Sequence, residues 1–450
     1  MDFETLYGRV RGLPIIDWHN HLDMRMLAED KPLGSLYEVW VKADPYKHRA
    51  MRICGEPERV ITGDASEDEK WAAWTRTLPK LVGNPLFAWA KMELEKFKVG
   101  SGKFKVVDGE AKIENVLLSE WTPSKMLKKF NVEYLSPCVG ARECLTGFTR
   151  FSGLRDETGI NPVNPVNPVQ NTYKVTASLR MNAGDEISVE ALEKFDSAGC
   201  RVVDISVDDA SQLSTFNSQL STVAAYAAAH GWTMLLHLGA LRETSARLRA
   251  AAGPAGGFAG MRAPVDPAAV AAFLNGLEST HNVFSRKERK GRKGISAHSA
   301  SLRLCVKHNP DQNSLPRTIL LSLNPEAHAS LAVLAGSFNG AGLPGKVQLG
   351  PAWWWCDHEE GIRDVLEKNA AYGVLSTFVG MTTDSRSLLS FVRHDYFRRI
   401  LCKWVAEKVA SGSFPDDESL LRPMMENICY KNAKRVFSRP VNLVNPVNPV

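Results

Sequence analysis

The stretch LPIIDWHNHLD, residues 13–23, joins an apolar run typical of a buried β-strand to two histidines one residue apart. Alternate side chains of a strand point to the same face, so His19 and His21 could bind one metal ion together. Equally, these two polar residues could simply open a loop, because a two-histidine motif is not specific by itself. The remaining chain decides whether this strand starts a fold that gathers polar side chains at one edge.

Seven further β-rich runs follow the first one, and helical patterns separate most of them. The eight predicted strands are residues 13–19, 132–138, 173–180, 200–207, 232–239, 317–323, 346–354 and 373–381. Strands that alternate with helices favour an α/β fold, here a parallel eight-stranded β/α barrel of the TIM type. A doubly wound open sheet is the alternative, but no glycine-rich fingerprint follows the first strand.

The sequence predicts one barrel domain, residues 1–440, that carries three insertions. A stretch at about 24–130, rich in Trp, Leu, Lys and Glu, predicts a mostly helical insertion after the first strand. The repeat NPVNPVNPV in the low-complexity insertion 161–170, and the similar tail 441–450, place proline at every third position, which predicts extended surface chain or, alternatively, a proline-motif ligand. A basic stretch at about 284–312 also looks inserted, because long connections are uncommon in compact domains.

The charge distribution and the cysteines indicate which partners and which cellular compartment to expect. The net charge of +5 is concentrated between Arg286 and Lys293, where six basic residues accompany one glutamate, so a solvated loop is favoured over a nucleic-acid surface. We find neither a signal peptide nor an apolar run of about 18 residues, so we expect no membrane span. Scattered cysteines without a CxxC motif fit reduced thiols in a cytoplasm. The sequence leaves the oligomeric state open, and a homo-oligomer is possible.

Polar residues follow several of the predicted strands and would meet at the mouth of a barrel. They are His19, His21, Arg180, His237, Asp384 and Arg386. Two imidazoles and a carboxylate could bind zinc or manganese and leave a position open for a substrate oxygen. Structural alternatives remain, because His237 could be a hydrogen-bonded core residue and Asp384 or Asp357 could cap a helix. Three successive tryptophans, residues 353–355, cannot all face one side of a strand, so at least one, for which we select Trp354, should line the mouth.

Five motifs carry a resemblance to a known family. They are DWHNHL (17–22), YKHRAMR (46–52), LHLGALR (236–242), QLGPAWWWCDHEEGI (348–362) and GMTTDSRSLLSFVRHDYFRRILC (380–402). Together they resemble the uronate isomerase (glucuronate isomerase) family of the amidohydrolase superfamily, over about residues 13–437. The resemblance implies a distorted eight-stranded β/α barrel, one bound divalent metal, zinc or alternatively manganese, and interconversion of glucuronate with fructuronate or of galacturonate with tagaturonate.

The resemblance also implies roles for particular residues. His19, His21 and Asp384 match the metal ligands, and His237 matches a histidine near the metal. Tyr46 matches a catalytic tyrosine on the insertion, Arg386 an active-site arginine and Arg180 a substrate-binding arginine. The chain departs from the family in SPCVGARECL (136–145), where a Thr-Asp-Asp-Pro stretch is usual, and at Ile205, where the family has a histidine after the aspartate.

An aldose–ketose interconversion needs a base at C2, an acid at C1 and stabilisation of the enediol between them. Asp384 is our candidate for proton transfer, Tyr46 for a hydroxyl proton relay and Arg386 for stabilising negative charge. Arg180 would bind the substrate carboxylate. The rival hypotheses are a metal-dependent hydrolase on the same barrel, a catalytically decayed homologue and, favoured only by the basic stretch, a nucleic-acid binder.

Overall fold

The structure is a computed structural model, and it describes residues 1–97, 105–140, 173–182, 185–209, 211–215, 217–290, 315–340 and 342–438. The low-complexity stretches 161–170 and 441–450 lie outside the described residues. So does most of the basic stretch, residues 291–312. Their expected conformations therefore stay predictions.

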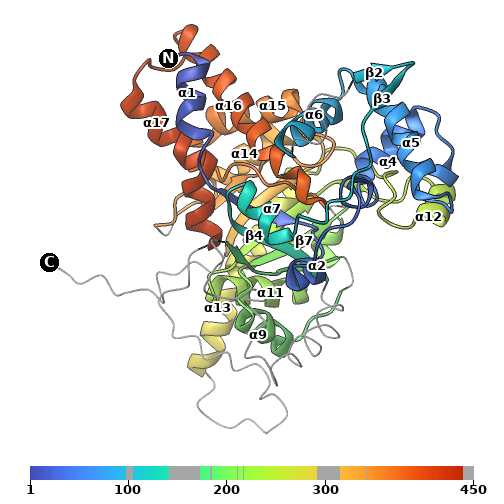
Figure 1. Cartoon of the computed structure of the whole chain (residues 1–450). Helices are drawn as coiled ribbons and strands as arrows, with labels where there is room; N and C mark the ends of the chain where they lie inside the picture. Colours follow the sequence, from blue (N-terminus) through green and yellow to red (C-terminus); the bar gives the residue numbers. More distant parts are fainter. Residues whose placement is uncertain are drawn as a thin grey trace, which may run out of the picture.

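A curled parallel sheet forms the centre of the molecule (Figure 1). Its strands, in spatial order, are β1 (Ile15–Asn20), β4 (Val132–Gly140), β6 (Ser178–Met181), β7 (Val202–Val207), β8 (Thr233–Leu238), β11 (Arg317–Ser322) and β12 (Val347–Leu349), while the short β5 (Lys174–Val175) pairs with β4. Every pairing within this sheet is parallel. The predicted β/α architecture is confirmed, and seven of the eight predicted runs contain a strand.

The prediction of an eighth strand, residues 373–381, is wrong. Residues 373–381 contain the 3₁₀ turn Leu375–Thr377 and no strand. Gly380 has φ +71°, and a Cβ added there would lie 2.1 Å from the carbonyl oxygen of Ile428. This left-handed residue interrupts the extended backbone that a ladder of hydrogen bonds needs. The apolar run TFVGM is therefore buried for packing rather than paired as a strand.

Residues 378–385, which we call the seam segment, nevertheless fill the gap between β12 and β1. On one side, the amide of Val379 donates to Oε1 of Gln348, a side chain of β12, at 3.0 Å. On the other side, the amide of Asp384 donates to the carbonyl of His19 at 3.1 Å, and the amide of His21 donates to the carbonyl of Ser385 at 2.8 Å. The barrel is therefore closed by scattered bonds in place of an eighth ladder, which explains its distortion.

A buried carboxylate on β1 holds the seam segment in place. Asp17 is fully buried, and its oxygens accept from the Thr382 hydroxyl at 3.0 Å and from the amide and hydroxyl of Thr383 at 2.6 and 2.8 Å. His394 Nε2 lies 3.1 Å from the same carboxylate. Asp17 thus joins the first strand to residues near the other end of the chain.

Helices cover the outer face of the sheet. They are α1 (Phe3–Val10), α9 (Val189–Ser197), α10 (Ser211–Thr215), α11 (Asn217–Ala229), α13 (Pro267–Lys290), α14 (His328–Gly336), α15 (Glu359–Tyr372), α16 (Val392–Ala410) and α17 (Glu418–Glu426). Helix α12 (Ala246–Ala252) lies away from this face, on the connection that follows β8. Helix α13 extends to Lys290, so the first part of the predicted basic insertion continues a helix. Among the described residues, no helix is both long and apolar enough to cross a membrane.

The stretch between β1 and β4 is mostly helical and has its own apolar core. Its elements are α2 (Met24–Glu29), α3 (Leu36–Trp40), α4 (Pro45–Ile53), α5 (Glu67–Thr77), α6 (Pro85–Phe97), the hairpin of β2 (Lys105–Val107) and β3 (Glu110–Lys112), and α7 (Pro123–Lys129). In Figure 1, α4 and α5 lie beside α12, on the connection that follows β8. The side chain of Arg52 donates to the carbonyl of Gly256 across this contact. The insertion therefore closes over one side of the sheet, next to that connection.

The concave side of the sheet changes from apolar to polar along the strands. Tyr134, Val202 and Leu235 belong to one buried apolar cluster. Because alternate residues share a face, Cys138 on β4, Asp204 on β7 and His237 on β8 lie on the same side, nearer the carboxyl ends. The fold thus gathers titratable groups from separate strands at one mouth.

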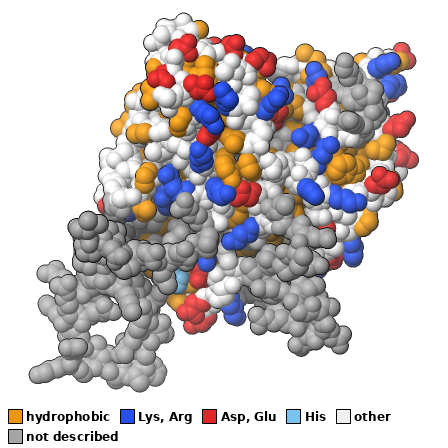
Figure 2. All heavy atoms as spheres, turned by 60° about the vertical axis from the view of Figure 1, so that its left-hand side comes forward, with side chains coloured by type: hydrophobic (Ala, Val, Ile, Leu, Met, Phe, Trp, Pro, Cys, Tyr) orange, Lys and Arg blue, Asp and Glu red, His pale blue; other side chains and the backbone are white. Residues whose placement is uncertain are grey.

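The outer surface carries charges of both signs. On the face shown in Figure 2, the basic and acidic side chains of the described residues are interspersed.

Candidate active site

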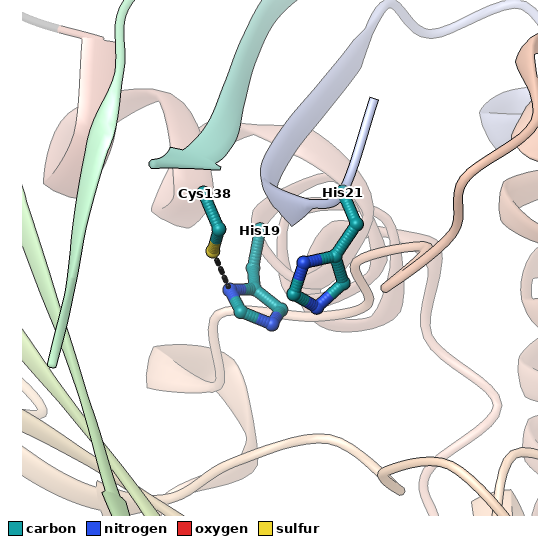
Figure 3. Close-up of side chains that lie close together, drawn as sticks. All are labelled: His19, His21 and Cys138. Carbon is teal, nitrogen blue, oxygen red and sulfur yellow. Dashed lines mark hydrogen bonds between the residues drawn. The ribbon is translucent and has the colours of Figure 1, made fainter. Parts of the chain in front are cut away.

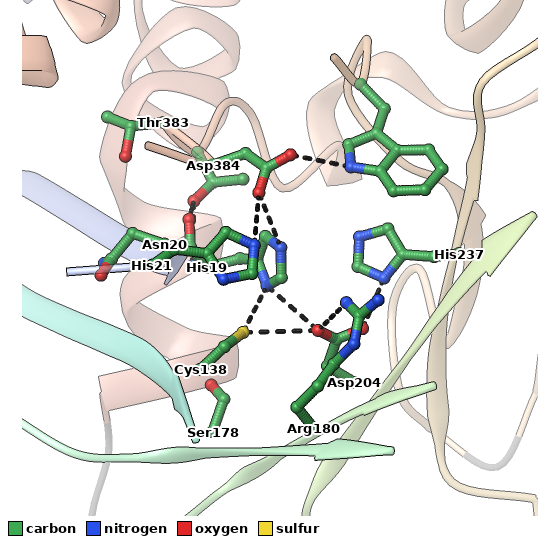
Figure 4. A network of polar contacts seen from close by, with 12 residues as sticks. His19, Asn20, His21, Cys138, Ser178, Arg180, Asp204, His237, Thr383 and Asp384 are labelled. Atoms are coloured by element: carbon green, nitrogen blue, oxygen red, sulfur yellow. Dashed lines mark hydrogen bonds and ion pairs between the residues drawn. The ribbon is translucent and has the colours of Figure 1, made fainter. Parts of the chain in front are cut away.

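His19, His21 and Asp384 converge at the mouth of the curled sheet (Figure 4). Asp384 Oδ1 lies 3.1 Å from His19 Nε2 and 3.1 Å from His21 Nε2. The other carboxylate oxygen, Oδ2, accepts a 2.9 Å hydrogen bond from the indole N–H of Trp353. Asp384 adopts φ +48°, a left-handed conformation that turns the seam segment so that this carboxylate faces β1. Strand β1 and the seam segment thus supply the three side chains.

These three side chains fit a divalent cation. Ligand atoms about 2.0–2.2 Å from one tetrahedral ion lie roughly 3.4 Å from each other, so contacts of 3.1 Å suit atoms that share an ion. His19 is 1% exposed, and its Nε2 has no hydrogen-bond partner among the described residues. Burial would raise the pKa of the Asp384 carboxyl, but its contacts with His19 and His21 hold that pKa well below the usual range. The group is therefore an anion flanked by two imidazoles, as a metal site requires.

Asp204 connects the remaining predicted residues of the mouth. Its Oδ1 lies 2.6 Å from His237 Nδ1, and its Oδ2 accepts from Arg180 Nη1 at 2.5 Å and from Cys138 Sγ at 3.3 Å. Burial would raise the pKa of Asp204, but the Arg180 guanidinium contributes to holding it well below the usual range. The structure thus ties Arg180 and His237 to one carboxylate.

His237 lies beside the three converging side chains but does not touch Asp384. Its ring centre is 4.8 Å from that of His19 and 4.4 Å from that of Trp353. Burial lowers the pKa of His237 to about 4, so the imidazole is neutral near pH 7. With its Nδ1 proton directed at Asp204, its Nε2 presents a lone pair that has no partner among the described residues.

Tyr46, on α4 of the insertion, reaches the mouth through Asp357. Its hydroxyl donates to Asp357 Oδ2 at 3.0 Å, and Arg393 Nη1 lies 3.3 Å from the same oxygen. Burial raises the pKa of Asp357 to about 6 and raises the pKa of Tyr46 well above its usual value. The interpretation of Asp357 as a helix cap is wrong, because His358 is the N-cap residue of α15. Asp357 instead joins a tyrosine and a buried guanidinium.

A cavity of about 680 Å³ opens onto these groups, within the range of small-molecule sites. Its lining includes His19, His21, Tyr46, Arg180, Arg242, Trp354, Asp384 and Arg386. Arg386 is exposed at this cavity and makes no hydrogen bond or ion pair with any described residue. His237 and Asp357 line a smaller, deeper cavity, which shares His19, Trp354 and Asp384 with the larger one. All the predicted site residues thus border one connected region.

Sequence reasoning missed several residues at this mouth. Trp353 orients Asp384, Arg393 pairs with Asp357, and Cys138 contacts His19. Arg242 lines the cavity and donates to Asp208 at 3.1 Å. The position of Cys138 near the end of a predicted strand was a usable signal. Arg393 offered none, because it sits inside a helix.

A parallel β/α sheet with titratable groups at the carboxyl ends of its strands defines the class of β/α-barrel enzymes. Comparison with known proteins identifies the family within that class. The profile of the family described as glucuronate isomerase matches residues 2–139 and 294–437. The chain is 32% identical to a uronate isomerase of Caldicellulosiruptor bescii in an alignment of 480 positions, gaps included, that covers 96% of each chain. It is also 32% identical over 478 residues to a uronate isomerase of Vibrio vulnificus, covering 95% of this chain and 94% of the relative. The chain belongs to the glucuronate isomerase family.

Solved structures support the same fold. A uronate isomerase from Thermotoga maritima superposes with a TM-score of 0.73 at 23% identity and covers 97% of both chains. A glucuronate isomerase from Caulobacter crescentus gives a TM-score of 0.70 at 19% identity, covering 99% of this chain and 96% of that one. At these identities the likeness concerns the fold alone.

Proposed function

We propose that this protein is a uronate isomerase that interconverts D-glucuronate with D-fructuronate and D-galacturonate with D-tagaturonate. Family membership supports the reaction. The observation that carries the assignment of roles is the meeting of two histidines, a carboxylate and a tyrosine–aspartate pair around one cavity. The reaction moves one proton between C2 and C1 and one between the two neighbouring oxygens, so it needs groups of both kinds.

We assign one divalent metal, zinc or manganese, to His19, His21 and Asp384. Two imidazole nitrogens and one carboxylate oxygen suit either ion. When bound, such an ion polarises a substrate carbonyl and orients neighbouring oxygens. The surroundings of buried His19 support this assignment, because its Nε2 makes no well-directed hydrogen bond within the described residues and lies 3.1 Å from Asp384 Oδ1, so an ion shared by the two atoms would satisfy both.

Asp384 is the proposed group that takes the proton from C2 and returns it to C1. It is anionic and borders the cavity. The indole N–H of Trp353 fixes the orientation of its carboxylate. His237 is neutral, and its Nε2 lone pair has no partner within the described part of the chain, so it is placed to accept a hydrogen bond from a hydroxyl at the deeper end of the mouth.

Tyr46 and Asp357 are the proposed relay for the proton that moves between the two oxygens. The raised pKa of Tyr46 keeps its hydroxyl protonated, so this hydroxyl donates to Asp357. A carboxyl with a pKa of about 6 can release and accept a proton near neutral pH, as a general base should. Arg393 pairs with Asp357 and lies with its guanidinium 5.1 Å from the centre of the Tyr46 ring, so it fixes both partners.

Two arginines and a tryptophan complete the proposed substrate site. Arg386 faces the cavity and has no partner among the described residues, so its guanidinium is available to stabilise negative charge on the enediol. Arg180 is held by Asp204 through one amino group while its side chain still lines the cavity, which suits binding of the uronate carboxylate. Trp354 gives the cavity a flat apolar wall for a face of the sugar.

We further propose a cytoplasmic protein whose partner is a small sugar acid. The cysteines in the described part of the chain, six in number, are all free thiols, which suits a reducing compartment. A homo-oligomer is compatible with this proposal.

The decisive experiment incubates the protein with glucuronate and galacturonate in D₂O, with and without a chelator. Isomerisation detected by NMR, lost on chelation and restored by zinc or manganese, supports the proposal. Parallel incubation with ester and amide substrates tests the hydrolase alternative. Hydrolysis without isomerisation would overturn the proposal. Asp384→Asn is the active-site control, and Asp417→Asn, at a remote helix cap, is its matched surface variant.

A further inference from the structure

Cys138 touches two members of the site from a third strand. Its Sγ lies 3.3 Å from His19 Nδ1 and 3.3 Å from Asp204 Oδ2 (Figure 4). Donor atoms of His19, His21 and Cys138 lie within 4.8 Å of one another, and Figure 3 shows the thiol directed at the His19 ring. The thiol therefore has two possible roles: a metal ligand, or a group that holds His19.

The two nitrogens of the His19 ring face different neighbours. Nε2 is on the side of Asp384, at 3.1 Å, and is buried without a hydrogen-bond partner among the described residues. Nδ1 is on the side of the thiol. A neutral imidazole binds an ion through the nitrogen that carries no proton. If Nε2 joins His21 and Asp384 around an ion, the ring proton is on Nδ1 and needs an acceptor there.

Cys138 is the acceptor within reach of that proton. Asp204 Oδ2 is 3.8 Å from His19 Nδ1, beyond hydrogen-bond distance, so the carboxylate does not serve directly. The thiol sulfur can accept a hydrogen bond from the N–H of His19 while its S–H donates a hydrogen bond to Asp204. Arg180 and His237 hold Asp204 in place. We propose that Cys138 is a positioning residue that fixes the tautomer and orientation of His19 for a divalent ion, an inference that rests on the proposed function.

The test measures metal binding to the metal-free, full-length protein, independently of turnover. Zn²⁺ affinity is determined by competition with a chromogenic chelator for the wild type, Cys138→Ala and Cys138→Ser. Cys200→Ala is the control, because the Cys200 thiol also donates one hydrogen bond, to the carbonyl of Val202 at 3.2 Å, away from the mouth. Cys200 is buried whereas Cys138 is half-buried, so the control change is at least as demanding for the fold. The absorption spectrum of the Co²⁺-loaded wild type shows whether a thiolate is bound to the metal.

Cys138→Ala should bind Zn²⁺ about 10- to 100-fold more weakly than the wild type, the usual loss when a partner of a metal-bound histidine is removed. Cys138→Ser should lose less, because a hydroxyl can both donate and accept but sits on a shorter bond. Cys200→Ala should bind normally. The Co²⁺ wild type should lack a thiolate-to-cobalt charge-transfer band.

Two results would overturn the inference. Unchanged affinity in both Cys138 variants would show that the thiol does not hold His19. A charge-transfer band in the wild type would make Cys138 a ligand instead, and this measurement decides even if a variant fails to fold. A wild type that binds no divalent ion would refute the proposed metal site itself, which is a distinguishable outcome.

Discussion

Replacing Tyr46 by phenylalanine tests whether its hydroxyl moves a proton or only supports the fold. The change removes one hydrogen bond, of 3.0 Å to Asp357, and keeps the ring against Trp89 and Trp355. A hydrogen bond to a charged group contributes about 1.5–3 kcal/mol, which bounds the loss of unfolding free energy. Loss of a proton relay lowers turnover by about 10²- to 10⁴-fold. That range corresponds to about 2.7–5.4 kcal/mol of activation free energy, so a loss at its upper end exceeds what the hydrogen bond alone contributes.

The assay is uronate isomerisation at saturating substrate, measured beside a thermal melt. Tyr134→Phe is the matched control, because its buried hydroxyl also makes one short contact, 2.5 Å to the Thr176 hydroxyl, away from the cavity. We expect similar melting temperatures for the two variants and a large loss of turnover in Tyr46→Phe only. Equal turnover in the two variants would refute the relay.

Three further predictions concern pH, charge geometry and metal. Because Asp357 has a pKa raised to about 6, it becomes protonated below that pH and can no longer accept a proton, so kcat/KM should fall as the pH drops through about 6. The effect of Asp357 on stability has the opposite sign, because ionising a carboxyl whose folded pKa lies above 3.8 costs stability as the pH rises. A melt at each pH should therefore show a folded enzyme along that limb, and a metal determination at each pH separates this titration from loss of the ion. Arg386→Lys keeps the charge but loses the planar fork, so kcat/KM should fall by about tenfold or more with an unchanged melt, and normal kinetics would exclude a role for the fork. Removing the metal with a chelator should abolish turnover and lower the melting temperature, because an ion at 100 times its Kd stabilises the folded state by about 2.7 kcal/mol; an unshifted melt on adding back zinc or manganese would contradict binding at this site.

The order of strands and helices was predictable because each β-rich run satisfies its own local preferences. The eighth run was not, since TFVGM is as apolar as a strand, and only the tertiary position of Gly380 against Ile428 shows why it cannot pair. Likewise β12 ends at Leu349, shortly before Pro351, whose missing N–H cannot extend a ladder.

Some residues of the candidate site could be predicted from the sequence, and others could not. His19, His21 and Asp384 follow β-rich runs or lie beside recognisable motifs, so their meeting could be anticipated from the barrel rule. Asp357 could not be assigned in advance, because an aspartate before a helix reads as a cap until the structure shows that His358 takes that place. Contacts such as that of Arg393 with Asp357 depend on how a helix packs, which no local pattern encodes.

The contacts of Asp17 with the seam segment determine at which stage of synthesis and folding the mouth can form. Asp17 and Thr382 are 365 residues apart, so the contact closes most of the chain into a loop. Contacts of such long range form late, because the entropy of closure must be overcome before the contact stabilises anything. A growing chain therefore carries its two histidines long before it has the carboxylate opposite them, which arrives only when the seam segment has left the ribosome. Chains released before that point would lack Asp384, the proposed metal ligand and proton carrier, so we expect them to be inactive.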